Sequence, residues 1–222
     1  MIAQSNSMEL FYLVRHGKTE WNAENRICGR SDVPLSEAGR RQAKRLAERL
    51  KPISFDALYS SPLKRAFDTA RFISERIGLE PVVDHRLVEL DYGQWEGKTL
   101  EEIRKNDPKS LRAWEADPGR VAPPGGESGL EVQQRVVSFL DSLAAKQRKG
   151  RVAVVLHKTV CRLAICHVLG MSPSDYRRRL IMENAALSII QSRKDGWQLI
   201  TYNDTSHLSA CHRGHISPGD EF

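Results

Sequence analysis

Two histidines stand just after short apolar runs of strand length. His16 follows the run FYLV at 11–14, and His157 follows the run VAVVL at 152–156. Ligands of open α/β sheets bind at the carboxyl ends of the strands, so the two imidazoles would meet there if the strands are neighbours. A single histidine is more often a satisfied or surface residue. Two of them at strand ends favour a shared polar crevice.

The residues around His16 suit a phosphate group. Arg15, His16, Gly17 and Thr19 supply a guanidinium, an imidazole, a flexible backbone position and a hydroxyl. Arginine binds phosphate oxygens in a bidentate manner, and glycine lets backbone N–H groups approach closely. The stretch matches neither the P-loop pattern nor the dinucleotide fingerprint, so it indicates no nucleotide module.

The elements that must position these residues alternate between β-rich runs and amphipathic helices. Strands are predicted at 11–14, 55–59, 152–156, 187–191 and 197–202, the last two joined by a hairpin turn with a DG dipeptide. Helices are predicted at 35–50, 62–77, 99–117, 129–148 and 159–169. This alternation predicts one α/β domain, a three-layer α/β/α sandwich with a mainly parallel sheet.

Local signals place the ends of these helices. Ser36 and Ser61 are expected as N-caps, the second with Pro62 as the first helical residue. Gly78 is expected to end the helix over 62–77, and Pro108 to interrupt the one over 99–117. We divide the chain into an extension (1–8), a domain (9–207) with a partly helical cap at about 99–128 over the pocket, and a tail (208–222).

Composition narrows the class of protein. The chain has 222 residues, 40% of them hydrophobic and 28% charged, which excludes collagen-like, low-complexity and disordered chains. No apolar run has the length of a membrane span, and the start MIAQSNSMEL lacks the features of a signal peptide, so a cytoplasmic location is expected. The four cysteines are expected as free thiols.

The net charge of +6 suits small anionic molecules. It also suits weak nucleic-acid binding, but no motif supports that function. The basic run from Arg40 to Arg49 is interpreted as the solvated face of a helix. The tail residues His207, Cys211, His212 and His215 could suggest a metal site, but no second ligand cluster accompanies them, so no metal is expected.

The motif LVRHGKTEWN at 13–22 resembles the arginine–histidine–glycine signature of the histidine phosphatase superfamily, which includes the cofactor-dependent phosphoglycerate mutases. Further similar segments follow in the order of that family over roughly 9–207. They are CGRSDVPLSEAGRRQA (28–43), YSSPLKRAFDTA (59–70), ELDYGQWEGKT (89–99), PPGGES (123–128) and VVLHK (154–158).

The resemblance implies a role for each matching residue. His16 would be the nucleophile that forms a phosphohistidine. Arg15 and Arg65 would hold the phosphate, His157 would complete the pocket, and Glu89 would donate a proton to the leaving group. Glu89 could instead be an ordinary acid before a turn. The scheme requires no metal and no cofactor, because arginines stabilise the charge that spreads over the phosphoryl oxygens in the transition state.

Further positions are expected to contact the substrate. They are Asn22, Cys28, Gly29, Tyr92 and Lys158. Many relatives have glycine where this chain has Lys158. A lysine at a helix N-terminus opposes the helix dipole, so we hypothesise that it meets a carboxylate at the far end of the ester. The alternative is that it points to solvent.

Three departures from the mutase pattern favour hydrolysis. The segment ICGRSD replaces a threonine–glycine–tryptophan motif, ELDYGQWEG resembles the phosphatase branch, and a longer basic insertion is absent between Gly97 and Pro123. The expected activity is that of a phosphomonoesterase acting on a small anionic ester, similar to broad-specificity, alpha-ribazole or cofactor-independent phosphoserine phosphatases. A 2,3-bisphosphoglycerate-dependent mutase and a non-catalytic phosphoester-binding protein are the alternatives. A homodimer is expected from base rates alone.

Overall fold

The computed structural model describes residues 9–145 and 150–208. The predicted extension, the end of the helix predicted at 129–148, and tail residues 209–222, which include Cys211, His212 and His215, lie outside the described residues. The strands are β1 (Glu9–Arg15), β2 (Ala57–Ser60), β3 (Pro81–Val83), β4 (Gly150–Leu156), β5 (Leu187–Arg193) and β6 (Gly196–Asp204).

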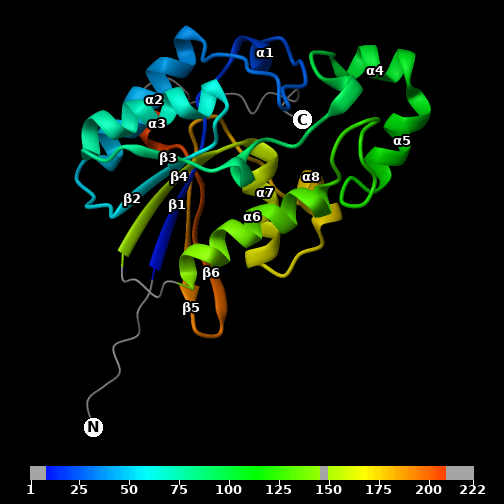
Figure 1. Cartoon of the computed structure of the whole chain (residues 1–222). Helices are drawn as coiled ribbons and strands as arrows, with labels where there is room; N and C mark the ends of the chain where they lie inside the picture. The colour runs from blue at the N-terminus through cyan, green and yellow to red at the C-terminus, as the bar shows by residue number, and fades with distance from the viewer. Residues whose placement is uncertain (1–8, 146–149, 209–222) are drawn as a thin grey trace.

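The strands form one sheet in the order β3-β2-β4-β1-β5-β6. The first four are parallel to their neighbours, and β5 and β6 are antiparallel (Figure 1). The prediction of a mainly parallel sheet in an α/β fold is confirmed, and so is the hairpin near Asp195 and Gly196. As a result, β1 and β4, which carry the two histidines at their ends, are direct neighbours.

Helices cover both faces of the sheet. They are α1 (Glu20–Ala23), α2 (Glu37–Leu50), α3 (Lys64–Ile77), α4 (Leu100–Asn106), α5 (Pro108–Ala116), α6 (Gly129–Ala144), α7 (Lys158–Val168) and α8 (Tyr176–Arg179). None of the helices in the described part of the chain is both long enough and apolar enough to cross a membrane.

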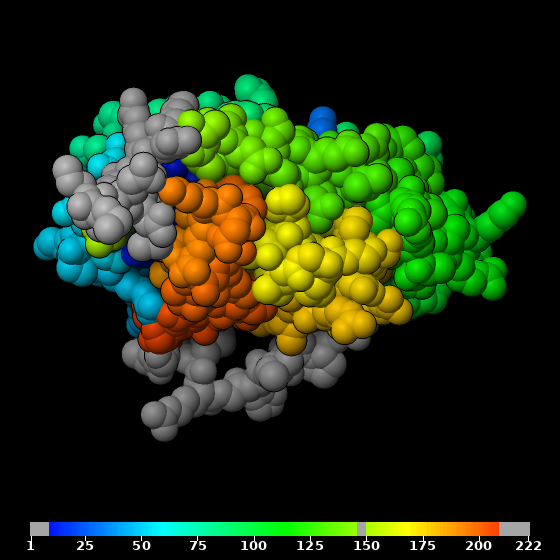
Figure 2. Space-filling model, turned by 90° about the horizontal axis from the view of Figure 1, so that it is seen from below, coloured from blue at the N-terminus to red at the C-terminus, as the bar shows by residue number. Residues whose placement is uncertain are grey.

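Alternation along β1 divides the core into two layers. Phe11 and Leu13 belong to the cluster with α6 and α7, whereas Tyr12 and Val14 belong to the cluster with α2 and α3. Successive side chains of a strand point to opposite faces, so an uninterrupted apolar strand needs helices on both sides. Figure 2 shows the β5–β6 hairpin (orange) beside the segment of α7 and α8 (yellow), which agrees with the packing of α7 on β6.

The helix ends confirm some local predictions and correct others. Ser36 caps α2 through a hydrogen bond from the backbone N–H of Gly39 (3.1 Å), and Gly78 ends α3 in a left-handed conformation. Ser61 was wrongly predicted as the N-cap of α3, which begins at Lys64 after Leu63. The break predicted at Pro108 is confirmed, because the helical stretch 99–117 is divided there into α4, which ends at Asn106, and α5. Pro108 is the first residue of α5, which Asp107 caps.

The predicted cap contains α4 and α5, which lie beyond the carboxyl ends of the parallel strands, on the same side as α1 (Figure 1). Aromatic packing joins it to the domain. Trp114 of α5 contacts Trp95 edge-on with ring centroids 5.5 Å apart, and Tyr92 with centroids 6.1 Å apart. Edge-to-face pairs of this kind add to the free energy of area burial. The cap is therefore attached to the segment that carries Tyr92.

Candidate active site

The two histidines meet because of the register of β1 on β4. Arg15 pairs with Leu156 in the parallel ladder, and the N–H of His16 donates to the carbonyl of Leu156 (3.1 Å). His157 is the next residue of the other strand. The ring centroids of His16 and His157 are 5.1 Å apart, so the two imidazoles meet at the strand ends as predicted.

The hydrogen bonds of His16 fix its tautomer. Its Nδ1 lies 2.7 Å from the carbonyl oxygen of Gly17, which can only accept, so Nδ1 carries the proton. Nε2 is therefore unprotonated, and its lone pair accepts from the Nε–H of Arg65 (3.3 Å). Burial, with the charges of Arg65 and Arg15, holds the pKa of His16 well below its ordinary value. A neutral imidazole with an unprotonated nitrogen at the pocket is what a nucleophile requires.

Arg65 is fully buried and is held by backbone carbonyls. Its Nη1 donates to Ser31 (2.8 Å), and its Nη2 donates to Gly29 (2.6 Å) and to Cys28 (3.4 Å). Its Nε faces Nε2 of His16 at 3.3 Å. Because the carbonyls fix the plane of the guanidinium, its positive charge is held beside the attacking nitrogen before any substrate binds.

Glu96 in turn supports the loop that holds Arg65. Its carboxylate accepts hydrogen bonds from the backbone N–H groups of Arg30 (2.6 Å) and Ser31 (2.7 Å). A Cβ on Gly29 would lie 2.7 Å from the backbone carbonyl oxygen of Leu90 and 2.3 Å from Oε1 of Glu96, so the loop needs glycine at this close approach. This arrangement connects the segment 89–99 to the nucleophile through the loop 28–31.

His157 is the N-cap residue of α7 and is fully buried. Its Nε2 lies 2.8 Å from the hydroxyl oxygen of Ser61. Its Nδ1 has no hydrogen-bond partner among the described residues. Burial and the charge of Arg65 hold its pKa well below the ordinary value. This imidazole is therefore neutral, and its Nδ1 is buried without a hydrogen-bond partner among the described residues.

Glu89 lies at the N-terminus of α7. Its Oε2 accepts from the backbone N–H of Thr159 (3.2 Å), and its Oε1 accepts from that of Leu90 (2.8 Å). The backbone on either side is fixed by Arg135 of α6, which donates to the carbonyls of Val88 (2.6 Å) and Glu89 (3.2 Å). The carboxyl group is thus held at a set position on the wall of the pocket.

A pocket opens beside His16, with a cavity volume of about 50 Å³. Since one water needs roughly 10–15 Å³ by this measure, the space is about that of the four oxygens of a phosphate group. The residues that line it are Arg15, His16, Asn22, Arg26, Ile27, Cys28, Glu89, Tyr92, Lys158 and Thr159. Seven of the ten predicted site residues are among them.

The family model named "Histidine phosphatase superfamily (branch 1)" matches residues 11–205. The chain belongs to this superfamily. It is 37% identical over 196 residues to phosphoserine phosphatase 1 of Hydrogenobacter thermophilus, a match that covers 88% of this chain and 92% of the relative. It is 35% identical over 206 residues to a Salmonella choleraesuis protein named "Probable phosphoglycerate mutase GpmB", with 90% and 94% covered.

Solved structures of the superfamily share the fold. A mycobacterial glucosyl-3-phosphoglycerate phosphatase superposes with a TM-score of 0.81 at 31% identity, covering 88% of this chain and 99% of that one. Sequence and structural relatives named as phosphatases identify the chain as a phosphatase of this superfamily. The predicted family and fold are confirmed.

Three predicted site residues of this phosphatase do not line the pocket. Arg65 and His157 lie directly behind His16, in contact with its ring. Gly29 contacts Arg65 through its carbonyl, so its expected place beside the substrate is taken by Cys28. Burial raises the pKa of the Cys28 thiol to about 11, so this cysteine is not a second nucleophile.

Two residues of the signature have structural roles instead of the expected contacts with phosphate. The N–H of Gly17 donates to Thr69 (3.2 Å), and a Cβ on Gly17 would lie 2.4 Å from the carbonyl oxygen of Gly39. This glycine therefore lets α2 pack against the loop. Thr19 is buried and caps α1 through a hydrogen bond from the N–H of Asn22. Asn22 itself lines the pocket as expected.

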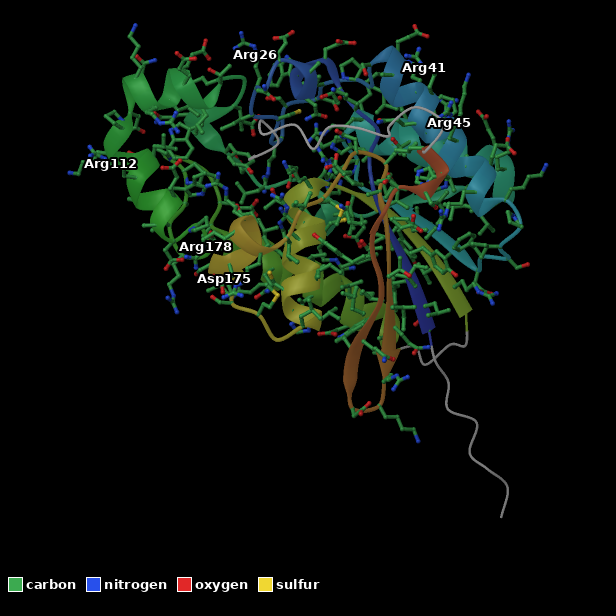
Figure 3. All side chains as sticks on the ribbon, turned by 180° about the vertical axis from the view of Figure 1, so that it is seen from behind. Arg26, Arg41, Arg45, Arg112, Asp175 and Arg178 are labelled. Carbon is green, nitrogen blue, oxygen red and sulfur yellow. The ribbon has the colours of Figure 1, made fainter. Side chains whose placement is uncertain are left out.

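Sequence reasoning missed Arg26, Thr159 and Ser61. Arg26 lies between α1 and α4 (Figure 3), where its Nη1 donates to the carbonyl of Gly97 (2.9 Å) and to Glu102 (3.3 Å). Thr159 contacts both Glu89 and Tyr92. Ser61 and Thr159 adjoin residues already singled out, but nothing in the local pattern distinguished them from caps and helix positions.

The exposed arginines of α2 agree with the interpretation of this basic run as a solvated face. Arg41 and Arg45 lie on the outer side of α2 (Figure 3), and both are exposed. Among residues 9–145 and 150–208, no group of three or more His, Cys, Asp or Glu side chains could hold a metal ion.

Proposed function

We propose that the enzyme hydrolyses a small phosphomonoester through a phosphohistidine on His16, with Glu89 as the proton donor. The observation that carries the proposal is the state of His16: a neutral ring, with Nε2 unprotonated and a buried guanidinium beside it. Relatives named for phosphoserine and for glucosyl-3-phosphoglycerate support this class of substrate.

In the first step, Nε2 of His16 attacks phosphorus and the bond from phosphorus to the ester oxygen breaks. An alkoxide leaves poorly, so protonated Glu89 gives its proton to that oxygen and the alcohol departs. Arg15 and Arg65 stabilise the charge on the phosphoryl oxygens. His157, whose Nδ1 has no hydrogen-bond partner among the described residues, would interact with the same group.

In the second step, water attacks the phosphorus of phosphohistidine. The Glu89 carboxylate accepts a proton from this water, the phosphorus–nitrogen bond breaks, and inorganic phosphate is released. His16 regains its neutral form and Glu89 its proton, so the cycle closes. Every group in this scheme is a side chain of the chain itself, and we expect it to proceed without an added metal or cofactor.

Phosphorus NMR tests the proposal directly. Enzyme in excess chelator is given phosphoserine or 3-phosphoglycerate, with His16→Ala as the parallel sample. Inorganic phosphate that accumulates with the wild type alone is the expected result. Phosphate release by His16→Ala at the wild-type rate would exclude the phosphohistidine.

The relative named as a mutase defines the alternative outcome. Formation of 2-phosphoglycerate from 3-phosphoglycerate, dependent on added 2,3-bisphosphoglycerate and without free phosphate, would replace hydrolysis by isomerisation. Binding without either product would indicate a phosphoester-binding protein.

A further inference from the structure

The segment 182–186, which leads into β5, contacts the arginine–histidine–glycine signature at several points. The N–H of Ala185 donates to the carbonyl of His16 (3.1 Å). Nη1 of Arg15 donates to the carbonyl of Met182. No motif of the sequence indicated this segment, yet it supports the backbone of the nucleophile and the guanidinium next to it.

The backbone of this segment has an unusual conformation where it meets the nucleophile. Ala185 has a positive φ of 56°, which residues other than glycine rarely adopt, and it is fully buried. Such backbone persists only where the surrounding contacts determine it, and it is found most often at functional sites. The preceding residue, Asn184, is therefore held at a defined position beside the signature.

The contacts of Asn184 fix the orientation of its side-chain amide. Its Nδ2 donates to the carbonyl oxygen of His16 (3.4 Å) and to Oδ1 of Asn22 (3.3 Å). A backbone carbonyl oxygen can only accept, so the nitrogen of the Asn184 amide is the end that faces it. The same nitrogen requires an oxygen at Asn22.

Asn22 is held in one orientation by two donors. Its Oδ1 accepts from the backbone N–H of Thr19 (3.1 Å) and from Nδ2 of Asn184. Its own Nδ2 has no hydrogen-bond partner in the described part of the chain, and Asn22 lines the pocket together with Arg15 and His16. With the oxygen engaged, the amide has two N–H groups left to donate to a ligand.

We propose that Asn184 is a positioning residue, which orients Asn22 so that the Nδ2 of Asn22 donates to the phosphoryl oxygens. Rotating the Asn22 amide would break both bonds to its Oδ1 and turn an oxygen toward the anionic phosphoryl group. Donors that are oriented before the substrate binds stabilise the transition state most effectively. The assignment rests on the proposed function, because it presumes that the phosphoryl group lies against His16.

A double-mutant cycle tests the assignment. The variants are Asn184→Leu, which keeps the branched shape of the side chain but cannot donate, Asn22→Ala, and the two combined. Asn106→Leu, at an exposed position of α4, is the control. The measured quantities are kcat/KM on p-nitrophenyl phosphate and the constant for competitive inhibition by inorganic phosphate. The inhibition constant does not depend on how much folded enzyme each preparation contains, so a loss of stability alone would not change it.

For Asn22→Ala we expect the inhibition constant of phosphate to rise about 10- to 100-fold, as for lost hydrogen bonds to a charged group. Asn184→Leu should raise it about 3- to 10-fold while Asn22 is present, and by less than about twofold further when position 22 is already alanine. The values of kcat/KM should fall in the same pattern, and Asn106→Leu should match the wild type. Effects that fail to add in this way show that two residues act as one unit.

Three outcomes would overturn the assignment. Equal effects of Asn184→Leu with and without Asn22 would make Asn184 a structural support of the segment 182–186. An inhibition constant of Asn184→Leu that matches the wild type would show that Thr19 alone orients Asn22. Both results would leave hydrolysis by the wild type intact. A wild type that neither hydrolyses p-nitrophenyl phosphate nor binds inorganic phosphate would overturn the proposed function, and the role of Asn184 with it.

Discussion

Nε of Arg65 lies 3.3 Å from Nε2 of His16. Of the two ring nitrogens, Nε2 is the one that the carbonyl of Gly17 leaves unprotonated. The guanidinium is therefore aimed at the atom that would attack phosphorus, and it disfavours protonation of that atom. One arginine both keeps the nucleophile neutral and offers positive charge where negative charge develops.

Replacing Arg65 by lysine should nearly abolish turnover. A single ammonium cannot occupy the place between three carbonyls and an imidazole that the planar guanidinium fills. We expect kcat to fall about 100- to 1000-fold, the usual effect of losing one preorganised donor to the transition state. Steady-state kinetics measures this, with Arg71→Lys on the exposed side of α3 as the control. A variant with near-normal kcat would show that Arg65 is not needed beside the nucleophile.

The two histidines should make folding stability fall as the medium becomes acidic. Both remain neutral in the folded protein, because burial holds each pKa well below its ordinary value. In the unfolded chain they take up protons near pH 6.5, so below that pH the unfolded state binds more protons and stability decreases. Each contributes at most about 1.4 kcal/mol per pH unit until its folded-state pKa is reached.

Thermal unfolding between pH 5 and pH 8 measures this effect. His157→Gln should show a shallower loss of Tm below pH 6.5 than the wild type. His167→Gln, at an exposed position of the same helix, should show the wild-type slope. A wild-type Tm that stays constant as pH falls would mean that the histidines are already charged in the folded state.

The loss of kcat caused by Glu89→Gln should depend on the leaving group of the ester. Glutamine keeps the shape of the side chain but cannot give up a proton, so alkyl esters should lose about 100- to 10,000-fold in kcat. p-Nitrophenyl phosphate, whose phenolate leaves without help, should lose far less. Measuring kcat of Glu89→Gln on both substrates tests this, and Glu80→Gln, at an exposed position, is the control. Equal losses on both would mean that Glu89 acts through binding and not as an acid.

Arg135 should position Glu89 without touching the substrate. Besides the carbonyls of Val88 and Glu89, it pairs with Glu127 (3.0 Å), and both side chains are mostly buried. Arg135→Met should cost about 3 kcal/mol of stability, because it leaves the mostly buried carboxylate of Glu127 with the half-exposed Arg30 (3.2 Å) as its remaining ion-pair partner. It should also lower kcat on alkyl esters more than on p-nitrophenyl phosphate, which a loss of stability alone would not do. Arg112→Met, on the exposed face of α5, is the control.

Arg162→Met should leave stability unchanged or raise it. Arg162 is buried in α7, its Nε has no hydrogen-bond partner, and no carboxylate among the described residues forms an ion pair with it. Replacing a poorly compensated buried charge by an apolar side chain of similar length is often neutral or stabilising. Tm measured at pH 7.5 decides this. A fall in Tm of several degrees would reveal that the charge is needed.

Much of this architecture could be predicted from the sequence because its signals are local. The apolar runs that carry His16 and His157, the helical periodicity of α2 and the motif around Glu89 each lie within a few adjacent residues. Nothing within the sequence around Arg65 or around Glu96 indicates that Glu96 supports the loop that holds Arg65. That relationship depends on how the loop 28–31 folds back on α3.

Other features could not be predicted from the sequence, because they depend on which of several possible partners a side chain contacts. Ser61 and Pro62 match the sequence signal for a helix start, yet the Ser61 hydroxyl contacts His157 and α3 begins two residues after Pro62. The predicted cap is helical, but no side chain from 99–128 lines the pocket. The cap instead contacts two residues that line the pocket. Trp114 of the cap packs on Tyr92, and Glu102 of the cap forms an ion pair with Arg26.

The pairing of Arg15 with Leu156 means that the spacing of the two histidines is fixed by the sheet and not by any loop. Deleting one residue from β4 would shift its register and turn His157 toward the opposite face of the sheet. The cap, by contrast, enters and leaves the domain without interrupting this ladder. Segments of other lengths could therefore be grafted between 99 and 128 while the nucleophile stays in place, so that substrate choice and phosphoryl chemistry can evolve, or be engineered, separately.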